Sequence, residues 1–86
     1  MSAKQEKTLE RIFERPTRAD IDWSKIESLF RAHGAEIKSG KGSRVKIWLN
    51  GKSAHVHKPH PQKQAPKWLI EELRDFLDNL GIRPRH

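Results

Sequence analysis

Apolar and polar residues alternate in two neighbouring segments of the chain, 44–49 (RVKIWL) and 52–57 (KSAHVH). Successive side chains of a β-strand point to opposite faces of its sheet, so this alternation predicts two strands with one buried face. The residues between the two segments are Asn50 and Gly51. Asn-Gly favours the type I′ turn of a two-residue hairpin, because both central residues of that turn take a positive φ. The pattern therefore predicts a β-hairpin whose register is fixed by its turn.

This register sorts the side chains of the hairpin onto two faces. The apolar face carries Val45, Ile47, Leu49, Ala54 and Val56. The other face carries Arg44, Lys46, Trp48, Ser53, His55 and His57. Arg44 is expected opposite His57, and Lys46 opposite His55. We expect the first face in the core, whereas the second is basic, open to solvent and suited to a polyanion.

The segment from Asp20 to Gly34 shows helical rather than strand periodicity. One side of it carries Trp23, Ile26, Leu29, Phe30 and His33. Asp22 can cap this helix, Ser24 with Glu27 offers a capping box as an alternative, and Gly34 can end it.

Other segments complete the set of predicted elements. Residues 67–80 predict a last helix, which Gly81 ends. Residues 1–15 have weak helical periodicity before Pro16, and residues 35–38 predict a short strand. The stretch 58–66 carries prolines at 59, 61 and 66 and is expected to be an exposed loop.

The resulting order is helix, three strands and helix, after an N-terminal helical extension. Both main helices must bury an apolar stripe, and the apolar face of the hairpin is the matching partner. We therefore predict an α+β fold with a three-stranded antiparallel sheet and two helices on one of its faces.

Composition narrows the class of protein and of partner. The 86 residues include 18 basic and 11 acidic ones, a net charge of +7, and no cysteine. Between Lys38 and Lys67 every Asp/Glu/Lys/Arg residue is basic. This clustering favours an anionic partner over a basic surface that serves solubility alone. No apolar run approaches the ~20 residues of a membrane span, and the N-terminus lacks the apolar region of a secretory signal, so a cytoplasmic protein without membrane contact is expected.

The basic face has the residue types that RNA cleavage requires. The 2′-OH of RNA is an internal nucleophile, so cleavage needs a base, an acid and positive charge near the phosphate. Histidine suits the proton transfers near neutral pH. Arg44 with His57, and Lys46 with His55, could supply these parts without a metal. Trp48 could stack on a base.

Residues beside and on the basic face could also hold a phosphate or a metal ion. Ser43 and the backbone amides of residues 40–43 could hold a phosphate. His55, His57 and His60 could in principle bind zinc or nickel. Prolines restrict the backbone around His60 and no carboxylate is close in sequence, so we predict neither a metal site nor a cofactor.

Four sequence motifs resemble the HicA toxin family, the small ribonucleases of HicA/HicB toxin–antitoxin pairs. They are the helix WSKIESLFRAHGAEI, the turn GKGSR, the segment AHVHKPHPQK and the closing helix ending FLDNLGI. The resemblance covers residues 23–82. It implies a double-stranded-RNA-binding-like α-β-β-β-α fold, metal-independent cleavage of mRNA that arrests translation, and a HicB-type antitoxin that covers the active face. Residues 1–19 would then be an extension, 20–82 the HicA-like domain and 83–86 a loose tail.

The chain departs from the family pattern at one position. Members of the family typically carry Gly-Ser-His, with that histidine catalytic, whereas this chain has Arg44 there. The hairpin register places His57 across from Arg44, so these two residues are the catalytic candidates, with His55 and His60 in reserve. The candidates for RNA binding are Lys41, Ser43, Lys46, Trp48, Lys58 and Lys63.

Three functions remain open from the sequence. The first is an RNA endonuclease toxin. The second is a noncatalytic RNA-binding module on the same fold, and the third is an adaptor that binds DNA or an acidic protein.

Overall fold

The structure is a computed structural model and describes residues 2–85. Three helices and five strands follow one another along the chain. In order they are α1 (Ala3–Ile12), β1 (Ile21–Asp22), α2 (Trp23–Ala32), β2 (Glu36–Ser39), β3 (Arg44–Leu49), β4 (Lys52–His57), β5 (Gln64–Ala65) and α3 (Lys67–Asn79). None of the helices in this part of the chain is long and apolar enough to cross a membrane.

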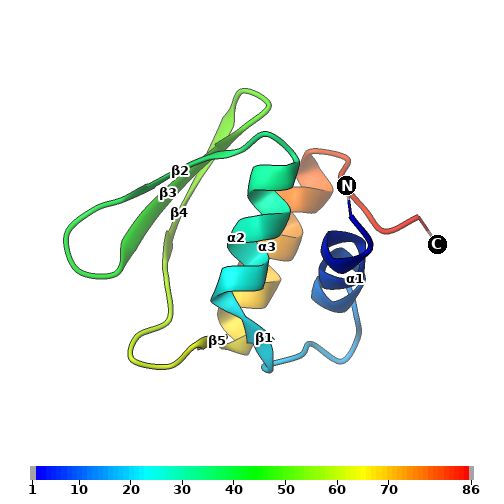
Figure 1. Cartoon of the computed structure of the whole chain (residues 1–86), viewed down its shortest axis with the longest axis horizontal. Helices are drawn as coiled ribbons and strands as arrows, with labels where there is room; N and C mark the ends of the chain where they lie inside the picture. The colour runs from blue at the N-terminus through cyan, green and yellow to red at the C-terminus, as the bar shows by residue number, and fades with distance from the viewer. Residues whose placement is uncertain (1, 86) are drawn as a thin grey trace.

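The elements form three layers (Figure 1). The antiparallel sheet has the strand order β2-β3-β4. Helices α2 and α3 cover one face of it, α2 against β2 and α3 against β4, and α1 packs on the other side of this helix pair. This arrangement confirms the predicted α+β fold, with its α-β-β-β-α order and its N-terminal helix.

The hairpin between β3 and β4 has the predicted register. Asn50 and Gly51 take φ values of 50° and 80°, as a type I′ turn requires. Arg44 pairs with His57, Lys46 with His55 and Trp48 with Ser53. The alternation of buried and exposed residues along β3 follows from this register.

Side chains from the sheet and all three helices share one core. Those with almost no exposed surface include Leu9, Ile12, Ile26, Leu29, Phe30, Ile47, Leu69, Ile70, Leu73 and Leu77. Val45, Leu49 and Val56 of the sheet are also buried, as predicted, whereas Ala54 on the same face is only partly buried. Phe76 of α3, which the apolar stripe of this helix predicts to be buried, is only partly buried at the edge of the core, with its ring centre 6.1 Å from that of Phe30.

The start of α2 differs from the sequence prediction. The expected helix began at Asp20, but Ile21 and Asp22 instead form β1, which pairs with β5 at Ala65 and Gln64. Asp22 occupies the N-cap position without a side-chain hydrogen bond, so the predicted carboxylate cap is wrong.

The segment before α3 caps α2 instead. The backbone N–H of Trp23 donates to the carbonyl oxygen of Lys63 at 2.8 Å. The proline-rich stretch was predicted as an exposed loop, yet it ends in β5, where Ala65 is fully buried.

A buried arginine fastens the N-terminal segment to α3. Arg74 is 5% exposed, and its guanidinium donates to the carbonyl oxygens of Ile12 and Glu14 at 2.8 and 3.1 Å. It also donates to Oγ1 of Thr17 at 3.0 Å. Three acceptors from residues 12–17 therefore fix where α1 and the following loop lie.

Charged groups order the rest of that loop and the C-terminal end. Arg18 donates to both carboxylate oxygens of Asp20, and this hydrogen bonding lowers the pKa of the Asp20 carboxyl. Arg83, in the tail predicted to be loose, forms an ion pair with Asp78. Residues 1 and 86, which belong to the predicted extension and tail, lie outside the described part of the chain.

Substituting Ile47 by Ala should lower the free energy of unfolding by about 2–5 kcal/mol, because it leaves a cavity in the core. Trp48→Ala, one residue along, should cost less because Trp48 lies on the partly exposed face. Urea denaturation of both variants measures the difference. A larger loss for Trp48→Ala would contradict the register.

Substituting Arg74 by Met should lower the free energy of unfolding by about 1–3 kcal/mol, because buried acceptors lose their donor. Arg31→Met is the matched control, since Arg31 is exposed and its ion pair with Glu27 is long, at 3.8 Å between nitrogen and oxygen. It should stay within about 0.5 kcal/mol of wild type. Equal stability of the two variants by thermal and urea denaturation would show that Arg74 does not fasten the N-terminal segment.

Candidate active site

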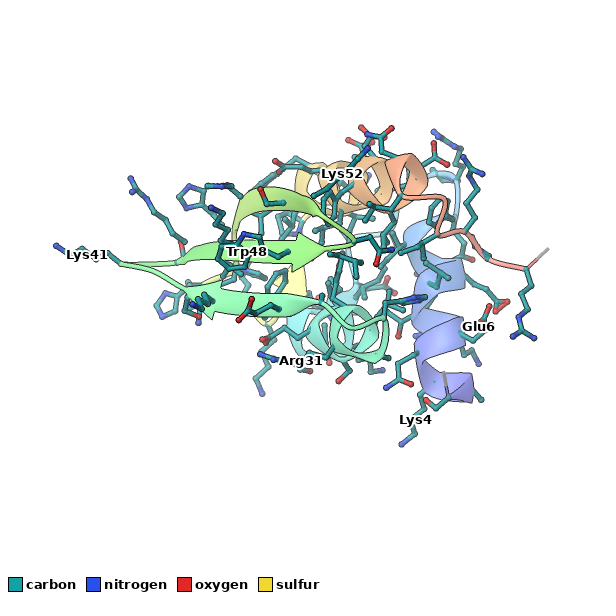
Figure 2. All side chains as sticks on the ribbon, turned by 90° about the horizontal axis from the view of Figure 1, so that it is seen from above. Lys4, Glu6, Arg31, Lys41, Trp48 and Lys52 are labelled. Atoms are coloured by element: carbon teal, nitrogen blue, oxygen red, sulfur yellow. The ribbon has the colours of Figure 1, made fainter. Side chains whose placement is uncertain are left out.

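The uncovered face of the sheet carries the candidate site. Figure 2 shows this face from above, with Trp48 near its middle and Lys41 at the far end of the β2–β3 loop. Two outward residues of β3, Lys46 and Trp48, have a partner on both neighbouring strands. Lys46 lies between Lys38 of β2 and His55 of β4, and Trp48 lies between Glu36 of β2 and Ser53 of β4.

Arg44 and His57 form the closest type of cross-strand pair. The N–H of Lys58 donates to the carbonyl oxygen of Ser43 at 2.8 Å, so Ser43 and Lys58 form a hydrogen-bonded pair. Hydrogen-bonded and non-hydrogen-bonded pairs alternate along an antiparallel ladder. Arg44 and His57 therefore form a non-hydrogen-bonded pair, in which opposed side chains approach most closely, and so do Lys46 and His55.

Ser43 contacts the imidazole of His57. Its Oγ lies 3.4 Å from Nδ1 of His57, which is a long hydrogen bond whose direction depends on the tautomer. If Nδ1 is engaged in this way, Nε2 is the ring nitrogen that points to a ligand.

The loop before β3 contributes less to a phosphate site than the sequence indicated. The amide of Gly40 donates to the carbonyl oxygen of Arg44 at 2.8 Å. That amide is therefore not available to a phosphate, and the expectation that all amides of residues 40–43 form a cradle is wrong for Gly40.

Trp48 is covered by two lysines. The Nζ atoms of Lys46 and Lys38 lie 4.7 and 5.8 Å from the centre of its ring, within the range of cation–π interaction. A nucleobase that stacks on Trp48 would have to displace at least one ammonium group. The same two groups could then move to the phosphates on either side of that base.

Most of the residues predicted to act in catalysis or RNA binding line two hollows. The larger, of about 470 Å³, lies on the open face and is bordered by Lys38, Ser39, Gly40, Arg44, Val45, Lys46, Trp48, His55, Val56 and His57. The smaller, of about 320 Å³, is bordered by Gly42, Ser43, Lys58 and His60. His60 is thus grouped with Ser43 and Lys58 rather than with His55.

Two predicted RNA-binding residues lie apart from these hollows. Lys41 is exposed at the tip of the β2–β3 loop (Figure 2). Lys63 is exposed beside β5, where its carbonyl is bonded to Trp23. Neither residue borders either hollow.

Lys38 is a residue of the site that the sequence prediction missed. In the strand predicted over residues 35–38, an inward Ile37 implies that Lys38 faces outward. Its position opposite Lys46 could not be derived, because a four-residue loop of residues 40–43 leaves the β2–β3 register open, unlike Asn-Gly.

The group of side chains is suited to acid–base chemistry at a phosphate. Two histidines, one arginine and two lysines share a solvent-accessible face, the combination required for proton transfer next to a negatively charged group. Across residues 2–85 no group of three or more His, Asp or Glu side chains is placed to hold a metal ion.

Comparison with known proteins identifies the family. Residues 23–82 match the family described as the HicA toxin of bacterial toxin–antitoxin systems. The chain belongs to the HicA toxin family. The matched residues run from the start of α2 to just beyond α3 and therefore include the sheet with both hollows, whereas α1 precedes them. No curated protein and no solved structure matches the chain.

Membership of the HicA family supports a toxin role and implies a cognate antitoxin of the HicB type. The open face of the sheet lies within the family-matched residues and carries most of the candidate residues.

Proposed function

We propose that this HicA toxin is a metal-independent RNA endonuclease, with mRNA as its substrate and the open sheet face as its active site. The observation that carries the proposal is the Arg44–His57 pair, with Ser43 Oγ 3.4 Å from His57. It combines a proton acceptor, a permanent positive charge and a group that orients the imidazole.

The reaction assigns a separate role to each member of the pair. His57 accepts the proton of the 2′-OH as its oxygen attacks the adjacent phosphorus. Arg44 stabilises the charge that develops on the non-bridging phosphate oxygens. The bond from phosphorus to the 5′-oxygen then breaks, and a protonated acid supplies the proton to that leaving oxygen. The products are a 2′,3′-cyclic phosphate and a 5′-OH.

Two histidines are candidates for that acid. His55 faces Lys46 on the same side of the sheet as His57. His60 borders the smaller hollow beyond Ser43. His55 is preferred, because it shares the larger hollow with His57 and Arg44.

The basic residues around the pair bind the strand. Lys38 and Lys46 lie beside Trp48, where a base and its flanking phosphates would be held together. Lys41 and Lys58 extend the positive surface past Ser43, and Lys63 adds a charge further along the chain. We propose that the HicB-type antitoxin inhibits by covering this face.

Noncatalytic RNA binding on the same surface is the second candidate function. The presence of Arg44 where HicA toxins typically have a catalytic histidine favours it. The two functions share the binding surface and differ in whether His57 acts as a base.

RNA affinity should fall steeply as salt rises from about 50 to about 200 mM, because phosphate contacts release counterions. Lys46→Gln should lower the slope of log affinity against log salt by about 0.7, the value for one phosphate contact on a single strand. Lys67→Gln, at the start of α3, is the control and should leave the slope unchanged. Fluorescence anisotropy measures all three proteins, and salt-insensitive binding by wild type would remove the polyanion-binding proposal.

Substituting His57 by Ala should slow RNA cleavage by about 10²–10⁴-fold, as expected for loss of a general base, and abolish growth arrest. Arg44→Ala should weaken both. The assay is cleavage of single-stranded RNA in excess EDTA, with the ends of the products identified.

Arg83→Ala is the matched control, because Arg83 is exposed, forms an ion pair with Asp78 of α3 and borders neither hollow of the sheet. It should cleave like wild type. Wild-type rates for His57→Ala would show that His57 is not the base. A wild-type protein that binds RNA and does not cut it would establish the noncatalytic function.

A further inference from the structure

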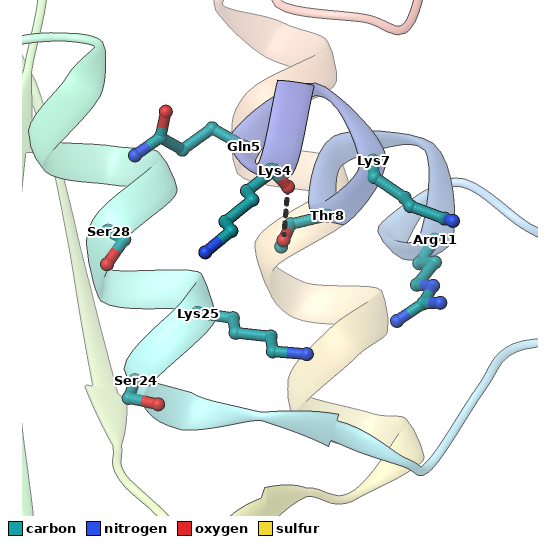
Figure 3. Close-up of a pocket in the computed structure, with 8 residues that line it drawn as sticks. All are labelled: Lys4, Gln5, Lys7, Thr8, Arg11, Ser24, Lys25 and Ser28. Atoms are coloured by element: carbon teal, nitrogen blue, oxygen red, sulfur yellow. Dashed lines mark hydrogen bonds between the residues drawn. The ribbon is translucent and has the colours of Figure 1, made fainter. Parts of the chain in front are cut away.

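A third hollow with basic lining residues lies between α1 and α2, apart from the sheet (Figure 3). Its volume is about 410 Å³, and its lining comes from Lys4, Gln5, Lys7, Thr8 and Arg11 of α1 and from Ser24, Lys25 and Ser28 of α2. In Figure 3 the side chains of Lys4 and Lys25 extend from the two helices into the gap between them, with Arg11 to the right.

The lining of this hollow is basic, and no acidic residue belongs to it. Lys7 and Arg11 also border a neighbouring hollow that contains Glu10 and Glu14, whereas Lys4 and Lys25 do not. Within residues 2–85 the ion pairs involve Arg18, Arg31 and Arg83, and none includes a basic residue of the hollow. Arg11 acts at a distance on Asp20, whose lowered pKa is due first to Arg18 and only in small part to Arg11. Like charges held close together in this way attract an anion.

The remaining lining groups identify the chemistry of that anion. Ser24, Ser28 and Gln5 offer hydroxyl and amide donors at the surface. The hollow has no hydrophobic residue in its lining, whereas a protein–protein interface normally has an apolar or aromatic centre. It has no aromatic ring on which a base could stack either. Ammonium, guanidinium and hydroxyl donors without a stacking surface suit the phosphates of a nucleic-acid backbone.

The position of the hollow suggests how a strand could reach it. Lys4 lies on the opposite side of the molecule from Lys41, and the labelled Arg31 of α2 lies between Trp48 and Lys4 in Figure 2. The exposed surface of α2 therefore joins the sheet region to the hollow. Five of the eight lining residues come from α1, which precedes the family match at residues 23–82. Arg74 holds this helix in place through Ile12 and Glu14.

We propose that the α1–α2 hollow binds backbone phosphates of the RNA strand that leaves the sheet face. It lengthens the RNA footprint without adding base preference. This inference rests on the proposed function, because it takes RNA as the ligand of the sheet.

The test compares RNA strands of different length on matched charge variants. Lys4→Gln/Lys25→Gln removes one exposed lysine from each helix of the hollow. Lys52→Gln/Lys67→Gln removes two lysines that border none of the hollows described here. Uncleavable 2′-O-methyl RNA of about 4 to about 16 nucleotides, the range of site sizes in single-strand-binding folds, is the probe in fluorescence anisotropy.

The hollow variant should bind the longest strand roughly tenfold more weakly than wild type, with a salt slope lower by about 1.4, because two phosphate contacts are lost. It should bind the shortest strand, and cleave a short substrate, as wild type does. The control variant should match wild type at every length, and urea denaturation should show equal stability of all three proteins.

Each other outcome decides against the inference in a different way. If the hollow variant matches the control at all lengths while wild type binds RNA, the hollow does not bind RNA and the proposed function stands. If the variant loses affinity for the antitoxin alone, the hollow is a protein-binding site and the inference is wrong. If wild type binds no RNA of any length, the proposed function fails and the inference fails with it.

Discussion

The positive φ values of Asn50 and Gly51 are the constraint on which the site depends. They fix a two-residue turn, and the turn fixes which residues of β3 and β4 are opposite one another. A slip of β3 by one residue would turn Arg44, Lys46 and Trp48 toward α2 and α3 and expose Ile47. The apolar residues of the same strands oppose such a slip, because Val45, Ile47 and Val56 would lose their place in the core. One turn and one core together determine which side chains meet on the open face.

A second constraint places the N-terminal helix. The guanidinium of Arg74 would be costly to bury without acceptors, and it finds three in the segment that follows α1. Leu9 and Ile12 add apolar contact from the helix itself. Helix α1 therefore joins the family-matched part of the chain as a third layer rather than as a loose extension. Its position beside α2 is what creates the basic hollow with Lys4 and Lys25.

The sequence was sufficient to predict the hairpin, the two main helices and the helical nature of residues 3–12. Each of these elements is determined by a periodic pattern or by turn residues within its own segment. The pairing of β1 with β5 could not be predicted, since two-residue strands carry no periodicity and prolines flank β5. The predicted capping of α2 by the Asp22 carboxylate was wrong for a related reason. The carbonyl oxygen of Lys63, which is distant in sequence, accepts a hydrogen bond from the backbone N–H of Trp23 at the start of α2. The position of Lys38 could be predicted only in part. An inward Ile37 places Lys38 on the open face of the sheet, but the pairing of Lys38 with Lys46 could not be derived. The α1–α2 hollow depends on contacts of Arg74 with residues about 60 positions away, which no local pattern contains.

Arg44 also limits which mechanisms this HicA toxin could use. A guanidinium is never deprotonated in a protein, so Arg44 cannot be the proton acceptor of the proposed cleavage. It can only stabilise charge. A proton acceptor must then come from a neighbour that reaches the same phosphate, and in a non-hydrogen-bonded pair the opposing side chain is the nearest one. That side chain is His57, which Ser43 contacts from the adjacent position. The strand pairing thus places a histidine and a permanent cation side by side on the sheet, which are the two groups that the proposed cleavage needs.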